Sequence, residues 1–131
     1  MNGVGRNPEM ADILVVDDDD VIRETLDELL SVDYSVQTAD TAEAALTKLE
    51  AQGFSVVLTD ISMPGLNGME LLNRVVEKYP GTPVIIISGH SDQDQAQSLI
   101  SRGAFDYLLK PFRLEVVEAS VKRAIEKSRS S

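Results

Sequence analysis

The chain has 131 residues, 43% apolar and 26% charged, as in an ordinary soluble domain that buries a core without disulfides or structural metal. It has no cysteine and one histidine, His90, which excludes a thiolate zinc site and a cysteine nucleophile and argues against a Ser-His-Asp triad. The net charge of −10 argues against a nucleic-acid-binding surface, and no apolar run reaches the length of a membrane span.

The two ends of the chain differ in character from its middle. Residues 1–10 lack the apolar core of a signal peptide, so we expect a flexible tail there and one domain over residues 11–131, working in the cytoplasm. Five of the twelve basic residues gather near the other end, which is typical of a solvated helix face: Arg113, Lys122, Arg123, Lys127 and Arg129.

Five short β-rich apolar runs alternate along the chain with amphipathic stretches at helical spacing. The runs cover residues 12–17, 34–39, 54–60, 82–88 and 105–110. The helical stretches are predicted over about 21–30, from a cap at Asp40 or Thr41 to Leu49, over 67–79, over about 91–102 and over about 113–129.

The last two helical stretches differ in their apolar faces. The fourth is mostly polar with a thin apolar stripe, which predicts a loosely held helix that ends at Gly103. That stripe consists of Ala96, Leu99 and Ile100. The fifth is predicted to turn a broader set inward: Val116, Val117, Val121, Ala124 and Ile125.

This alternation predicts a doubly wound α/β fold, in which a five-stranded parallel sheet carries helices on both faces. The runs "ILVV", "VVL" and "VIII" are continuously apolar, as strands buried on both faces should be. Such sheets bind ligands at the carboxyl ends of their strands, so the functional residues are expected at those ends.

Four of the expected strands end in polar side chains. The first ends at Asp17 and Asp18, the third at Asp60, the fourth at Ser88 and the fifth at Lys110. Oxygen ligands without sulfur or imidazole suit a hard cation such as Mg²⁺, and a lysine adds a charge for phosphoryl oxygens. An aspartate nucleophile beside Mg²⁺ and lysine indicates phosphoryl transfer.

Each of these residues also has a plain structural interpretation. Aspartate is favoured at a helix start, and that reading suits Asp19 and Asp20 of the "DDDD" run best. Asp60 could cap a turn in "DISMPGLNG", Ser88 could be a loop hydroxyl, and Lys110 could be an ordinary exposed cation. The coincidence of all these residues at strand ends on one side of a sheet favours the functional reading.

The same residues carry a family resemblance. From about Asp12 to Arg129 the chain resembles the response-regulator receiver domain of two-component signalling. The resemblance rests on four segments taken in order: Asp17-Asp18 after "ILVV", "DISMPGLNG" at 60–68, Ser88-Gly89 after "VIII", and "GAFDYLLKPF" at 103–112. It implies a flavodoxin-like sheet with strand order 2-1-3-4-5 and five helices.

The resemblance implies a metal-assisted phosphoacceptor site. Asp60 is the expected phosphoacceptor, receiving a phosphoryl group from the phosphohistidine of a sensor histidine kinase. Asp17, Asp18, Asp60 and the Ser62 backbone carbonyl are the expected ligands of Mg²⁺, and Lys110 is expected to neutralise the transferring group. The chain itself would act as a switch, promoting only its own phosphorylation and dephosphorylation.

The resemblance also implies a moving surface. Ser88 is expected to bring its hydroxyl onto the acyl phosphate, with Tyr107 turning inward as the switch aromatic and a cis bond at Lys110-Pro111. The surface formed by the fourth helix, fifth strand and fifth helix would change, and homodimerisation through those helices is a hypothesis. "GAFDYLLKPF" resembles transcriptional regulators that carry an ATPase module.

Two other functions compete with this one. A haloacid-dehalogenase-like phosphatase would use Asp17 as nucleophile and Asp19 as acid, but it needs carboxylates after its lysine, and "PFRLEVVEA" has no acidic pair. A pseudo-receiver would only dock with partners, and the intact set of charged residues argues against it. An FMN-binding flavodoxin-like protein is excluded, because the loop after the first strand is anionic.

Overall fold

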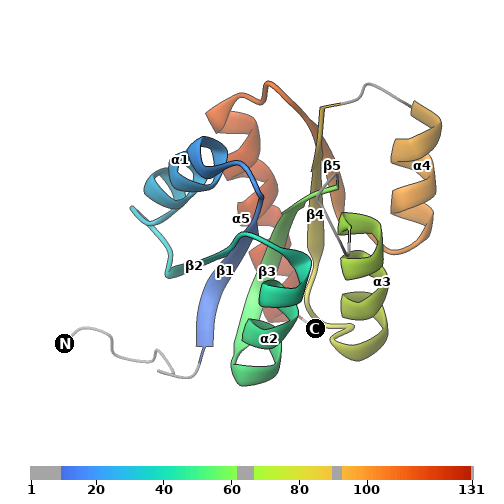
Figure 1. Cartoon of the computed structure of the whole chain (residues 1–131), viewed down its shortest axis with the longest axis horizontal. Helices are drawn as coiled ribbons and strands as arrows, with labels where there is room; N and C mark the ends of the chain where they lie inside the picture. Colours follow the sequence, from blue (N-terminus) through green and yellow to red (C-terminus); the bar gives the residue numbers. More distant parts are fainter. Residues whose placement is uncertain (1–9, 62–66, 90–92, 131) are drawn as a thin grey trace.

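The computed structural model describes residues 10–61, 67–89 and 93–130 (Figure 1). Within them, the five strands form one parallel sheet in the order β2-β1-β3-β4-β5, so the doubly wound fold and its strand order are confirmed. Since the first strand begins at Met10, the last residue of the expected tail belongs to the sheet. The strands are β1 (Met10–Val16), β2 (Val36–Ala39), β3 (Gly53–Asp60), β4 (Val84–Ser88) and β5 (Asp106–Leu109).

One helix follows each strand. The helices are α1 (Asp20–Leu30), α2 (Ala42–Ala51), α3 (Gly68–Lys78), α4 (Gln93–Ser101) and α5 (Leu114–Ser130). The first two residues of the helix expected over 91–102 lie outside the described residues. Across the part of the chain that the structure describes, no helix combines the length and apolar composition needed to cross a bilayer.

Side-chain caps explain where three helices begin. The Asp19 carboxylate accepts hydrogen bonds from the backbone N–H groups of Val21 and Ile22, so the run of aspartates does start α1 as expected. Thr41 and Asn67 each accept one bond from the N–H group three residues further on, at the starts of α2 and α3. Gly103 adopts φ +112°, a left-handed conformation that favours glycine, just after α4.

The helices cover the two faces of the sheet unequally. The apolar side chains of α1 and α5 pack on one face and those of α2, α3 and α4 on the other (Figure 1). Successive side chains of a central strand serve opposite faces: Ile13 and Val15 pack toward α1 and α5, and Leu14 and Val16 toward the other helices. Both faces of the central strands are therefore buried, which accounts for their continuous apolar runs.

The structure corrects one expected burial and refines another. Val116 was expected to face inward, but its side chain is 45% exposed, since it lies in the first turn of α5 beside Val117, which takes the inward position. In α4, Leu99 is fully buried while Ile100 is 46% exposed. The apolar stripe of α4 is thus even thinner than its sequence indicates.

Candidate functional site

The carboxyl ends of four strands meet at one edge of the sheet. Parallel pairing sets Val16 beside Thr59, Asp60 beside Ile87 and Ser88 beside Leu109. The residues that complete or directly follow these strands therefore lie close together, although they come from segments far apart in the chain. They include the predicted site residues Asp17, Asp18, Asp60, Ser88 and Lys110.

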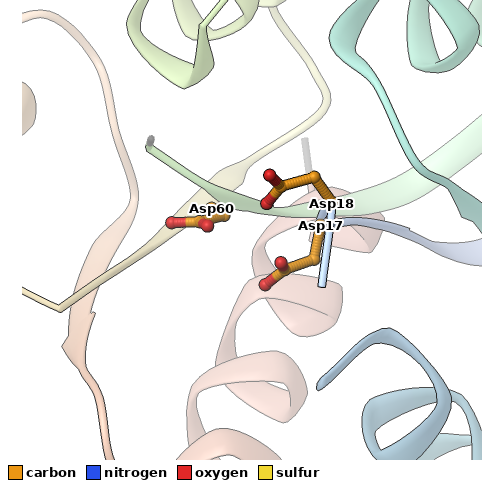
Figure 2. Close-up of side chains that lie close together, drawn as sticks. All are labelled: Asp17, Asp18 and Asp60. Carbon is orange, nitrogen blue, oxygen red and sulfur yellow. The ribbon is translucent and has the colours of Figure 1, made fainter. Parts of the chain in front are cut away.

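Three carboxylates form the centre of this edge. Asp17, Asp18 and Asp60 each offer one oxygen, and the three oxygens lie within 4.8 Å of one another (Figure 2). Asp17 and Asp60 are buried at 1% and 6% relative exposure, whereas Asp18 is exposed. The cluster is therefore a partly open acidic site, in which two carboxylates are buried and the third is exposed to solvent.

Lys110 places a cation among these carboxylates. Its Nζ lies 3.2 Å from Asp60 Oδ2 and 3.4 Å from Asp17 Oδ2. Burial lowers the pKa of the Lys110 ammonium, but the negative charges of Asp17 and Asp60 and the hydrogen bond to Asp60 raise this pKa by more, so it lies above its ordinary value. Lys110 is therefore positively charged at neutral pH.

Burial disfavours the charged form of the Asp17 carboxylate. Burial raises its pKa; the Asp19 N–H and Lys110 counteract this in part, while Asp60 adds to it, and the pKa ends above its ordinary value. Among the described residues, Asp17 Oδ2 is the buried side-chain oxygen that accepts no well-formed hydrogen bond, and it meets Lys110 Nζ only as an ion pair at 3.4 Å. An oxygen of this kind, next to two further carboxylates, fits a divalent cation that prefers oxygen ligands.

A close backbone contact holds β3 against the start of α3. The Gly68 N–H donates to the Ile61 carbonyl at 3.0 Å, and a Cβ atom at Gly68 would lie only 2.3 Å from the Asp60 carbonyl oxygen. Glycine is thus required at the end of "DISMPGLNG", because a side chain there would displace the backbone of Asp60. Ser62, whose carbonyl is a predicted metal ligand, lies outside the described residues, as does His90.

The predicted switch residues lie beside the cluster on β4 and β5. Ser88 is fully buried at the end of β4, and its carbonyl accepts a hydrogen bond from the Lys110 N–H at 2.8 Å. Tyr107 is half-buried in β5, and its hydroxyl donates to Gln95 Oε1 of α4 at 3.2 Å. The Lys110-Pro111 peptide bond is cis, as the family resemblance implies.

One residue at this edge of the sheet, Arg23, is not predicted from the sequence. Arg23, at the end of the first turn of α1, donates from Nη1 to the Asp17 carbonyl at 2.8 Å and pairs through Nη2 with Asp20. A basic residue close behind a run of four aspartates is the signal that could have drawn attention to it. Its spacing alone does not distinguish a solvent-facing side chain from one that folds back onto the strand end.

Comparison with known proteins decides the family. The family model described as the response regulator receiver domain matches residues 13–122, which is most of the chain. The chain belongs to the response regulator receiver domain family. It is therefore a receiver domain, a signalling switch of two-component systems, and neither competing function finds support in these matches.

Individual relatives agree with this assignment. The DNA-binding transcriptional regulator NtrC of Salmonella typhimurium is 41% identical over 114 residues, which cover 86% of this chain and 24% of NtrC. The transcriptional regulatory protein FixJ of Bradyrhizobium diazoefficiens is 38% identical over 88% of this chain and 57% of FixJ. This receiver domain thus spans about a quarter of NtrC and somewhat over half of FixJ.

A solved structure shows the same fold. A response regulator receiver domain protein from Clostridium thermocellum superposes with a TM-score of 0.84 at 34% identity, covering 91% of this chain and 97% of that one. Because that protein matches over nearly its whole length, the two chains share the architecture described above.

Proposed function

We propose that this receiver domain accepts a phosphoryl group on Asp60 from the phosphohistidine of a sensor histidine kinase. The observation that carries the proposal is the position of Asp60, buried at the end of β3 with Lys110 at 3.2 Å and two further carboxylates beside it. An ammonium and a cation site next to one carboxylate are what transfer of an anionic group onto that carboxylate requires.

The transfer exchanges one bond for another. A carboxylate oxygen of Asp60 forms a bond to phosphorus while the P–N bond of the phosphohistidine breaks, and the imidazole nitrogen keeps the electron pair of that bond. The product is an acyl phosphate on Asp60. Lys110 exchanges its contact with the Asp60 carboxylate for one with a phosphoryl oxygen, and so stabilises the negative charge that arrives with the group.

Mg²⁺ is the cation that the acidic cluster suits best. Asp17, Asp18 and Asp60 would hold it, and Mg²⁺ typically takes one or two protein carboxylates and keeps waters that a phosphate oxygen can replace. When bound, the ion neutralises charge on the transferring phosphoryl group. The Ser62 carbonyl, which the resemblance implies as a further ligand, belongs to the same proposal.

Phosphorylation would change the surface formed by α4, β5 and α5. A phosphoryl group adds close to two negative charges and several strong hydrogen-bond acceptors at Asp60. Ser88 would donate its hydroxyl to the acyl phosphate, and Tyr107 would turn inward and leave Gln95. Because α4 has a thin apolar stripe and Tyr107 bonds to it at 3.2 Å, α4 is the element that this change would move most readily.

The biological setting follows from the same proposal. The partner is a sensor histidine kinase, the location is the cytoplasm, and the chain modifies no substrate other than itself. Homodimerisation would use α4 and α5, and neither nucleic acid nor membrane would bind this domain directly. Because the relatives NtrC and FixJ are transcriptional regulators, its output would be the regulation of transcription.

Intact mass spectrometry after incubation with acetyl phosphate tests the proposal. We expect one phosphoryl adduct that requires Mg²⁺, disappears in Asp60→Asn and persists in Asp33→Asn, a matched change at an exposed aspartate. Release of phosphate over many turnovers without a lasting adduct would support a phosphatase. Absence of both an adduct and Mg²⁺ binding would make the chain a pseudo-receiver.

A further inference from the structure

The guanidinium of Arg23 folds back from α1 onto the end of β1. Its Nη1 donates to the backbone carbonyl of Asp17 at 2.8 Å, and its Nη2 pairs with the Asp20 carboxylate. The Arg23 side chain is 18% exposed, although the Asp20 side chain is 79% exposed. A cation so near a helix N-terminus is unfavourable for the helix itself, and the i,i+3 pair with the exposed Asp20 stabilises a helix only weakly, so helix stability alone gives little reason for an arginine at this position.

The hydrogen bond from Arg23 is one of three that hold Asp17 in place. The Asp17 N–H donates to the Ala39 carbonyl at 3.1 Å, and Asp17 Oδ1 accepts from the Asp19 N–H at 2.9 Å. With the carbonyl held by Arg23, three hydrogen bonds, with the end of β2 and with the start of α1, fix the backbone and one carboxylate oxygen of this residue. Oδ2 remains directed at the acidic cluster, 3.4 Å from Lys110.

We propose that Arg23 is a positioning residue for the cation site, because it fixes the peptide that joins Asp17 to Asp18. The peptide bond is planar, so holding the Asp17 carbonyl also sets the direction in which the backbone enters Asp18. Both carboxylates then stay on the Asp60 side of the loop (Figure 2). This inference rests on the proposed Mg²⁺-dependent function and adds to it a residue that touches no ligand.

A second role for Arg23 would act in the opposite direction. Arg23 is permanently charged and lies among several aspartates, so it could serve only to reduce their repulsion. A nearby cation disfavours the binding of another cation, and its removal would then tighten Mg²⁺ binding. If Arg23 instead positions the ligands, its removal weakens Mg²⁺ binding. The sign of the change in Mg²⁺ affinity therefore separates the two roles.

Isothermal titration of Mg²⁺ into the whole chain measures this sign without any phosphorylation step. Loss of a residue that orients metal ligands typically lowers affinity ten- to a hundredfold, and we expect about a tenfold weaker Mg²⁺ affinity in Arg23→Met. Arg23→Lys keeps the charge but cannot contact the Asp17 carbonyl and the Asp20 carboxylate through two separate nitrogens. We therefore expect its Mg²⁺ affinity to lie between those of the wild type and Arg23→Met. The amide resonances of Asp18 and Asp19 should shift in both variants before Mg²⁺ is added.

Arg123→Met is the matched control. This substitution on α5 removes the same charge and breaks the ion pair that Arg123 forms with Asp106 of β5 at 3.2 Å. The Mg²⁺ affinity of this variant should stay close to that of the wild type.

Wild-type or tighter Mg²⁺ affinity in Arg23→Met overturns the positioning role while leaving the proposed function intact. If Arg23→Met does not fold, Arg23→Lys decides in the same way: weakening supports the role and unchanged affinity overturns it. If the wild type itself binds no Mg²⁺, the proposed function fails together with this inference.

Discussion

Lys110 Nζ lies 3.2 Å from Asp60 Oδ2, although the two residues are 50 positions apart in the chain. The same ammonium faces Asp17 Oδ2 at 3.4 Å. One cation thus compensates two buried carboxylates that repel each other. A divalent cation or a phosphoryl group bound at this site would alter the balance between these charges.

Replacing Lys110 should destabilise the domain when no divalent cation is present. Leaving buried charges uncompensated costs about 3–5 kcal/mol, but the 21% exposure of the Lys110 side chain allows solvent screening, so we expect a loss of about 2 kcal/mol in Lys110→Met. Urea unfolding in EDTA measures it, and added Mg²⁺ should recover part of the loss. Lys78→Met, which breaks the exposed pair with Glu50, should change stability by under about 0.5 kcal/mol; equal losses in both variants would contradict the account.

The raised pKa of Asp17 predicts a pH dependence of stability. Burial raises this pKa above the ordinary value of 3.8, opposed in part by the Asp19 N–H, so the folded protein binds the proton more tightly than the unfolded chain. The contribution of Asp17 to stability is then fully present below pH 3.8 and is lost as the pH rises through the folded pKa. In EDTA, Asp17→Asn should therefore gain stability relative to the wild type as the pH increases above that value. Urea unfolding of both proteins across this range measures the difference, and a difference independent of pH would contradict the prediction.

Gly68→Ala should damage both the fold and the site. The new Cβ would lie 2.3 Å from the Asp60 carbonyl oxygen and 2.6 Å from the Ile61 Cα, and backbone atoms cannot swing away as a side chain can. We expect a loss of about 2 kcal/mol in urea unfolding and slower phosphorylation by acetyl phosphate. Gly81→Ala is the control, since no atom lies within 4 Å of its added Cβ. Wild-type stability and phosphorylation rate in Gly68→Ala would show that the backbone contact is unimportant.

The bond from Tyr107 to Gln95 should couple β5 to α4. A neutral hydrogen bond contributes about 1 kcal/mol, so Tyr107→Phe and Gln95→Ala should each lose stability on that scale. Since both residues also make other contacts, a double-mutant cycle is needed to isolate the shared bond. A coupling energy near zero would mean that this bond does not tie the strand to the helix.

Much of the fold and the site could be predicted from the sequence because local and global patterns agree. Continuous apolar runs predicted buried parallel strands, and Asp19 proved to be the N-terminal cap of α1. Asp17, Asp60 and Lys110 could be placed together because parallel topology brings the carboxyl ends of strands to one edge.

What the sequence could not supply were contacts that depend on three-dimensional placement. Val116 looks like an inward residue by composition, yet its angular position in α5 leaves it at the surface. Periodicity does not reveal that Arg23 folds back onto the Asp17 carbonyl, because a helix allows a long side chain several directions. The approach of Gly68 to Asp60 likewise depends on how α3 meets β3.

The central claim is that Asp60 carries the phosphoryl group, and borohydride trapping tests it most directly. Reduction of an aspartyl phosphate converts the aspartate to homoserine, which peptide mass mapping locates in the chain. After incubation with acetyl phosphate and Mg²⁺, we expect homoserine at position 60 alone. Homoserine at position 17 or 18, or at none of the three, would contradict the account.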